Sequence, residues 1–158
     1  MLASPSARAR DRAGVVGPVL VIDDHPLNCT LLERLLELDG YETIAAGSIG
    51  QAEVVLEQLQ PALIVLDMRL PDGDGATLAR RVRANPATSI CPIVACSAGT
   101  EREDRRRALD AGCDAYVGKP IDISSFARLV ADLTGPSRPE PRGPAGASRA
   151  ATALGQRP

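Results

Sequence analysis

Carboxylates end two apolar runs of this sequence. The run "VLVID" (19–23) leads into the pair Asp23-Asp24, and "ALIVLD" (62–67) ends on Asp67, just before a turn rich in Pro and Gly. Taking a carboxylate out of water beside an apolar strand costs free energy unless the group is paired or used there. The three carboxylates are therefore candidates for binding a cation or for acting as a nucleophile.

Two further polar residues follow short apolar runs. Ser97 ends "PIVACS" (92–97), and Lys119 follows "AYV" (115–117). A hydroxyl and a lysine beside a carboxylate and a divalent ion form a phosphoryl-binding set, in which cations neutralise phosphoryl oxygens and a carboxylate oxygen attacks. The chain has no Gly-rich phosphate loop or Walker sequence, which argues against bound ATP as the phosphate source.

Each of these residues, taken alone, also has an ordinary structural explanation. Asp67 suits a turn, Asp24 suits a helix cap, and isolated Ser or Lys residues usually lie at the surface. Asp72 and Asp74 are interpreted as turn and N-cap residues, because Gly73 and Gly75 beside them mark a tight loop. The coincidence of several such residues at strand ends is what favours a functional site.

The rest of the pattern alternates strands with helices. Four sets of apolar residues recur at helical spacing and predict four helices. They are Leu27, Leu31 and Leu35 (between Pro26 and Gly40); Ala52, Val55, Leu56 and Leu59 (after the cap Ser48); Leu78, Ala79 and Val82; and Phe126, Leu129, Val130 and Leu133. With strands at 19–23, 42–46, 62–67, 92–97 and 115–117, this rhythm predicts an α/β, doubly wound, five-stranded parallel sheet of order 2-1-3-4-5, a flavodoxin-like fold.

In that strand order the first and third strands are neighbours, so Asp23, Asp24 and Asp67 are expected to share one cleft at the carboxyl edge. Ser97 and Lys119 point to the same edge. Crowded carboxylates raise one another's pKa unless a cation joins them. A sparse set of oxygen ligands beside a phosphate suits Mg²⁺.

One predicted helix, at 100–112, has only Ala108, Leu109 and Ala111 to offer a core. A helix with so few apolar residues is expected at the low end of local stability, either as a plain surface helix or as a movable element.

Charge is distributed unevenly along the 158 residues. Arg8, Arg10 and Arg12 against Asp11 give residues 1–17 a net charge of +2, and residues 135–158 carry four arginines against Glu140, so that 18–134 holds −7. This acidic body argues against a nucleic-acid partner. The tails 1–17 and 135–158 are expected to be disordered because they lack apolar periodicity.

Membrane insertion and secretion are not expected, since the longest apolar runs fall far short of a span and the N-terminal residues lack an apolar signal region. The four cysteines, Cys29, Cys91, Cys96 and Cys113, lack the spacing of zinc or redox motifs. They are interpreted as core residues of a reduced, cytoplasmic protein.

Residues 18–134 resemble the receiver domain of the response regulators of bacterial two-component systems. The resemblance rests on the acidic pair Asp23-Asp24, on "DMRLPDGDG" from Asp67, on Ser97, 30 residues further, and on the Lys119-Pro120 step. With no output domain after residue 134, the chain looks like a single-domain regulator of the chemotaxis or cell-cycle kind. His25 departs from the asparagine that is common there in the cell-cycle type.

The resemblance implies a mechanism. Asp24, Asp67 and the backbone carbonyl of Arg69 would hold Mg²⁺, with Asp23 helping through water, and Asp67 would accept a phosphoryl group from a histidine kinase or phosphotransfer protein. Lys119 would pair with the phosphate, Ser97 would move to it, and Tyr116 would turn inward. The Lys119-Pro120 bond would be cis.

The same resemblance implies a phosphoprotein and not an enzyme, with self-dephosphorylation as its only turnover. The switched face near residues 98–133 would bind a downstream target, and a dimer formed on phosphorylation is a further expectation. Two alternatives remain at this stage: a phosphorylation-independent binding adaptor, and a haloacid-dehalogenase-like phosphatase. The phosphatase is disfavoured because position 69 is Arg where that chemistry needs Asp, and because the chain has no cap domain.

Overall fold

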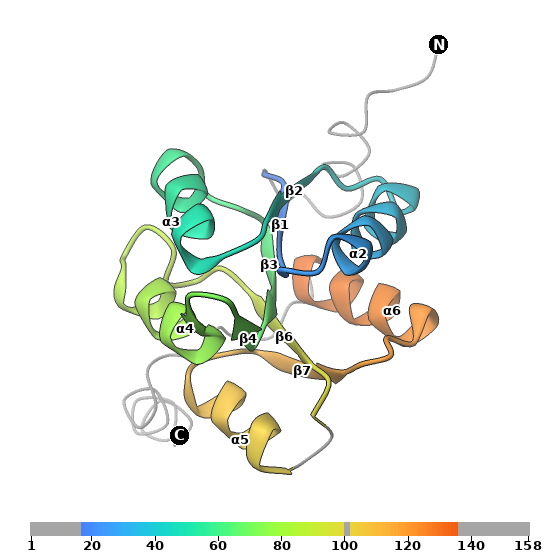
Figure 1. Cartoon of the computed structure of the whole chain (residues 1–158). Coiled ribbons are helices and arrows are strands. Elements are labelled where there is room, and N and C mark those ends of the chain that lie inside the picture. Colours follow the sequence, from blue (N-terminus) through green and yellow to red (C-terminus); the bar gives the residue numbers. More distant parts are fainter. Residues whose placement is uncertain (1–16, 100–101, 136–158) are drawn as a thin grey trace, which may run out of the picture.

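Five parallel strands lie between two layers of helices in the computed structural model, which describes residues 17–99 and 102–135 (Figure 1). The sheet has the order β2-β1-β3-β6-β7. This confirms the predicted doubly wound order, with β6 and β7 as the fourth and fifth strands. The elements are β1 (Val19–Ile22), α2 (Pro26–Leu38), β2 (Thr43–Ala46), α3 (Ile49–Gln58), β3 (Leu63–Asp67), β4 (Arg69–Leu70), β5 (Gly73–Asp74), α4 (Gly75–Ala84), β6 (Ile93–Ser97), α5 (Arg102–Asp110), β7 (Ala115–Gly118) and α6 (Ile123–Thr134).

Both faces of the sheet are covered. Helices α2 and α6 pack on one face, and α3, α4 and α5 pack on the other (Figure 1). Side chains alternate along each strand, so that in β1 Leu20 and Ile22 face α3 and α4 while Val19 and Val21 face α2 and α6. Burial on both faces explains why the strands read as unbroken apolar runs.

The buried face of α2 differs from the prediction. The helix forms as expected, but its buried residues are Cys29, Leu32 and Leu36. Leu27 and Leu31 are 74% and 46% exposed, and of the predicted set only Leu35 packs against the core. Both sets recur at intervals of three or four residues, which fits one face of a helix, and contact with the sheet and α6 decides which set is buried.

The ends of the helices follow their sequence signals. Pro26 occupies the first turn of α2, and Gly40 after its C-terminus has a φ of 91°, which glycine adopts without strain. The Ser48 side chain accepts a hydrogen bond from the N–H of Gln51. His25, without a capping hydrogen bond, is the N-cap of α2, so Asp24 is not used as a cap.

A buried ion pair closes the opposite, amino edge of the sheet. Arg83 of α4 and Asp114 before β7 lie 2.7 Å apart, with side chains 3% and 8% exposed. Three further guanidinium N–H groups donate to the backbone oxygens of Ser89, Cys91 and Gly112. This cluster fixes the loops before β6 and β7 to the end of α4, and the sequence analysis did not anticipate it.

Helix α5 is held far less firmly than its neighbour α4. Its only buried residue is Ala108, with Ala111 buried just after its end. Its longest-range polar contact in the described part of the chain is an ion pair between Arg107 and Asp74, the N-cap residue of α4. Sparse apolar contacts were predicted for this helix, although residues 100–101 at the start of the predicted range lie outside the described residues.

All four cysteines are buried and lie outside any disulfide. The predicted disordered tails, apart from Gly17 and Gly135, lie outside the described residues. Within the described ranges, every helix is too short or too polar to reach across a bilayer.

Candidate functional site: an acidic cleft with one lysine

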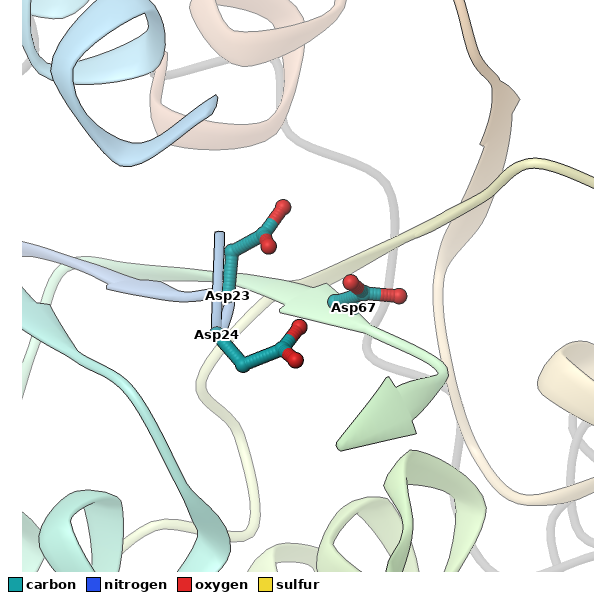
Figure 2. Close-up of side chains that lie close together, drawn as sticks. All are labelled: Asp23, Asp24 and Asp67. Atoms are coloured by element: carbon teal, nitrogen blue, oxygen red, sulfur yellow. The ribbon is translucent and has the colours of Figure 1, made fainter. Parts of the chain in front are cut away.

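The three predicted carboxylates converge at the carboxyl edge of the sheet (Figure 2). Strands β1 and β3 pair in parallel with Ile22 opposite Leu66, so Asp23 and Asp67 leave the sheet side by side. One oxygen from each of Asp23, Asp24 and Asp67 lies within 4.8 Å of the others. Asp23 and Asp67 are buried and Asp24 is exposed, so the cluster is open to solvent on one side.

Lys119 enters the same cluster from β7. Its Nζ atom lies 2.9 Å from Oδ2 of Asp23 and 3.2 Å from Oδ2 of Asp67. The Lys119 N–H donates to the carbonyl oxygen of Ser97, which anchors the segment beside β6. The Lys119-Pro120 peptide bond is cis, as the resemblance implied.

Burial and charge shift the pKa values in this cluster. Desolvation raises the pKa of Asp67, although the N–H of Arg69 and the charge of Lys119 act in the opposite direction. Desolvation alone would lower the pKa of Lys119, but its hydrogen bond to Asp23 and the charges of Asp67 and Asp23 raise it above its ordinary value. Lys119 therefore stays charged at neutral pH, and Asp67 is less readily ionised than a solvated aspartate.

A divalent cation fits this donor set. Three carboxylates and one ammonium carry a formal net charge of −2, and every candidate ligand atom is an oxygen. Mg²⁺ prefers such ligands and keeps several waters, which the exposed side at Asp24 allows. Asp23, Asp24 and Asp67 are the residues that would hold it.

Ser97 lies beside the cluster at the end of β6. Its neighbour Cys96 is in register with Asp67, and Ser97 is 2% exposed. The Ser97 hydroxyl oxygen accepts a hydrogen bond from the N–H of Gly99. Ser97 also lines a cavity of about 270 Å³ together with Met68, Arg69, Leu70, Gly73, Asp74, Asp104 and Arg107.

Tyr116 reaches the same loop from β7. Its ring packs against the core beneath α3, α4 and α5, and its hydroxyl donates to the carbonyl oxygen of Gly99. Ser97 and Tyr116 thus meet at Gly99, just before α5. A side chain at Gly99 would collide with the carboxylate of Asp104, which shows how closely α5 approaches this loop.

The loop after Asp67 is tightly packed. The N–H of Arg69 donates to Oδ1 of Asp67 over 3.1 Å, and the Arg69 side chain is exposed. A Cβ atom at Gly75 would lie 2.6 Å from the Asp67 carbonyl oxygen, so only glycine allows α4 to begin here. Asp74 caps α4 by accepting from the N–H of Ala76, as predicted.

The prediction missed two contacts around this loop. Asp72 accepts hydrogen bonds from the backbone of α3, and Asp74 pairs with Arg107 as well as capping its own helix. The partners of these contacts are 22 to 33 residues apart in sequence. No local pattern signals them, since an Asp in a Pro/Gly turn reads as a turn former whether or not it has a distant partner.

Comparison with known proteins identifies the family. Residues 19–131 match the model of the response regulator receiver domain. The chain is 30% identical to the polar-differentiation response regulator DivK of Brucella ovis over 117 residues, which cover 74% of this chain and 95% of DivK. It is 38% identical to the DNA-binding dual master transcriptional regulator RpaA of Synechocystis sp. over 117 residues, but spans only 48% of that protein.

Comparison with solved structures supports the same family. A two-component response regulator from Clostridium difficile superposes with a TM-score of 0.68 at 32% identity, covering 72% of this chain and 92% of that one. The receiver domain of the sensor histidine kinase PA1611 from Pseudomonas aeruginosa, solved with magnesium coordinated in its active-site cleft, gives 0.66 at 30% identity, with coverages of 73% and 95%. With the fold, the family match and these relatives in agreement, the chain belongs to the response regulator receiver domain family of two-component signalling.

Proposed function

We propose that this protein accepts a phosphoryl group on Asp67 from a phosphohistidine of a histidine kinase or phosphotransfer protein. The observation that carries the proposal is the convergence of Asp67 with Asp23, Asp24 and Lys119 in one half-open cleft. Three carboxylates beside one lysine form a site with excess negative charge, so a bound cation would have to offset this charge before a negatively charged phosphoryl group enters.

In the transfer, a carboxylate oxygen of Asp67 attacks phosphorus in line with the departing nitrogen. The N–P bond breaks, its electron pair stays on the imidazole, which takes up a proton, and a new O–P bond forms. Lys119 stabilises the charge on the transferred group, and the Ser97 hydroxyl donates to one of its oxygens. Asp24, Asp67 and the Arg69 carbonyl, with Asp23 helping through water, would hold Mg²⁺, which would supply further charge neutralisation there. Attack by water on phosphorus later releases phosphate and restores the Asp67 carboxylate.

The contacts at Gly99 link phosphorylation of Asp67 to a movement of α5. When Ser97 turns towards the phosphate it gives up its bond from the Gly99 N–H, and the Gly99 carbonyl that Tyr116 contacts moves with it. Helix α5 follows, because Asp104 lies against Gly99 and few apolar contacts oppose the motion. The altered surface of residues 98–133 is where a downstream protein binds.

The phosphodonor approaches on the side of α2. This helix begins two residues after Asp24 and presents Leu27 and Leu31, 74% and 46% exposed, towards solvent. Exposed apolar side chains beside a reactive site are typical of a protein-binding surface. The place of action is the cytoplasm, a reducing compartment that suits four cysteines outside any disulfide.

The proposal is tested by incubating the full chain with Mg²⁺ and a small phosphodonor, such as acetyl phosphate, and measuring its mass. The wild-type chain gains one phosphoryl group and Asp67→Asn gains none, while Asp110→Asn, which changes an exposed carboxylate of α5, behaves as wild type. Equal labelling of Asp67→Asn refutes the site assignment. An unlabelled wild-type chain would instead favour a binding adaptor that works without phosphorylation.

A further inference from the structure

A two-stranded hairpin follows the phosphoacceptor. Its strand β4 pairs antiparallel with β5, with Arg69 opposite Asp74 and Leu70 opposite Gly73. Arg69, whose backbone carbonyl is an expected direct ligand of the metal beside Asp24 and Asp67, therefore stands at one end of a short antiparallel unit. Pro71 and Asp72 form its tip.

The tip is fastened to a different helix. Oδ1 of Asp72 accepts from the N–H of Ile49 over 2.9 Å, and Oδ2 accepts from the N–H of Gly50 over 3.0 Å. These are the first two N–H groups of α3, which have no partner within the helix. The bonds from Gly50 and Ile49 lower the pKa of Asp72, so it is ionised at neutral pH.

Packing adds to this link. Gly73 has a φ of +155°, and a Cβ atom there would lie 2.9 Å from Cδ1 of Ile49. The hairpin therefore sits directly on the first turn of α3. At its other end, the N–H of Arg69 is bonded to Oδ1 of Asp67. Arg69 is thus held between the acceptor carboxylate on one side and, through the hairpin, α3 on the other.

We propose that Asp72 is a positioning residue for the metal site: by fastening the hairpin to α3, it holds the Arg69 carbonyl where the cation needs a ligand. The inference rests on the proposed function and deepens it. Mg²⁺ requires near-octahedral geometry at short distances, so a hairpin that is free to move weakens its binding. Residues that orient a metal ligand without touching the metal commonly affect affinity in this way.

The chain offers a matched control in Ser48. Its side chain caps the same helix by accepting from the N–H of Gln51, and within the described residues it makes no hydrogen bond to the hairpin. Ser48→Ala therefore weakens the start of α3 as Asp72→Ala does, without releasing Arg69. Asp72→Asn removes the charge of Asp72 and keeps one acceptor oxygen, which separates positioning from simple attraction of the cation.

The experiment is Mg²⁺ titration of the full chain by calorimetry, with circular dichroism to confirm folding. We expect Asp72→Ala to bind Mg²⁺ roughly tenfold more weakly, at the lower end of effects of this kind. Ser48→Ala should keep the wild-type affinity and Asp72→Asn should recover part of the loss. Wild-type affinity in Asp72→Ala, equal weakening in Ser48→Ala, or no recovery in Asp72→Asn would each overturn the inference. Failure of the wild-type chain itself to bind Mg²⁺ would refute the proposed metal site as well.

Discussion

Two clusters of buried charged residues lie at opposite edges of the same sheet, and they differ in the balance of positive and negative charge. At the amino edge, Arg83 and Asp114 match one to one, and the guanidinium also donates to three backbone oxygens. At the carboxyl edge, Lys119 faces Asp23 and Asp67 with Asp24 close by. The first cluster is closed and neutral, whereas the second is partly open and negatively charged.

The difference shows that burial of charge alone does not identify a functional site. A buried pair with every donor satisfied has nothing left to offer a ligand, and removing one partner costs mainly stability. A cluster with excess charge of one sign, open to solvent, is poised to take up an ion or a phosphoryl group. The balance of positive and negative charge therefore distinguishes the carboxyl-edge cluster from the amino-edge cluster.

The largest loss of stability is expected when Arg83 of the amino-edge cluster is replaced. Arg83→Met leaves Asp114 buried without its guanidinium, which should lower the free energy of unfolding by about 3–5 kcal/mol. Urea denaturation followed by circular dichroism measures this. Mg²⁺ should stabilise this variant by the same increment as wild type, because the proposed metal site is at the other edge.

Arg80→Met serves as the control, since Arg80 lies on the same helix and is exposed. It should change the free energy of unfolding by no more than about 0.5 kcal/mol. If the two variants were equally stable, the amino-edge cluster would not have the structural role assigned to it.

A smaller loss of stability, which Mg²⁺ reverses, is expected when Lys119 of the carboxyl-edge cluster is replaced. Lys119→Ala removes a charged hydrogen bond donor that is 19% exposed, so about 2 kcal/mol of stability should be lost without metal. Added Mg²⁺ should restore more stability than it gives to wild type, because it takes over the compensation of Asp23 and Asp67. Labelling by a phosphodonor should slow by roughly a hundredfold.

The pH dependence of the Lys119→Ala variant provides a check. Desolvation already raises the pKa of Asp67 above 3.8, and loss of Lys119 raises it further. A carboxyl with a raised pKa in the fold favours the folded state below its unfolded pKa, and this contribution is lost as pH rises through the folded pKa. The deficit of Lys119→Ala relative to wild type should therefore shrink on acidification; a deficit that grew would contradict the assigned charges.

The smallest effect concerns the exposed arginines of α5. Arg107→Ala breaks the ion pair with Asp74, whose partners are 50% and 37% exposed, so global stability should fall by less than about 1 kcal/mol. Local opening of α5 should nevertheless increase, because this pair ties the helix to Asp74 in the loop after Asp67. Hydrogen exchange of α5 amides should become faster while exchange in α4 stays unchanged.

Arg106→Ala is the matched comparison, since Arg106 pairs only within the described part of α5, with Asp110 at 3.7 Å. Its effect on exchange should be smaller than that of Arg107→Ala. Equal exchange in both variants would mean that the link to Asp74 does not restrain the helix.

The sequence was sufficient to predict the sheet and the convergence of the carboxylates, for a physical reason. Apolar runs that end on Asp23 and Asp67 reveal both the strands and the edge at which they finish, and parallel winding makes the two strands neighbours. Ser48 and Asp74 were predicted as caps because capping is local.

The missed features depend on contacts between distant segments. Leu27, Leu31 and Leu35 are as regularly spaced as Cys29, Leu32 and Leu36, and only the docking of α2 on the sheet and α6 selects the second set. Arg83 looks like any other arginine of an amphipathic helix until the loops before β6 and β7 surround it. The role of Asp72 depends in the same way on where α3 begins.

The four buried thiols have a practical consequence. Burial raises the pKa of Cys96 and of Cys113 to about 12, so in the folded chain they exist as unreactive thiols. An alkylating reagent reaches them only when the surrounding structure opens. Cys113 packs in the core beneath α3, α4 and α5, and Cys96 packs in the core beneath α2 and α6, so their separate alkylation rates would report how often each side of the sheet becomes uncovered, without any engineered label.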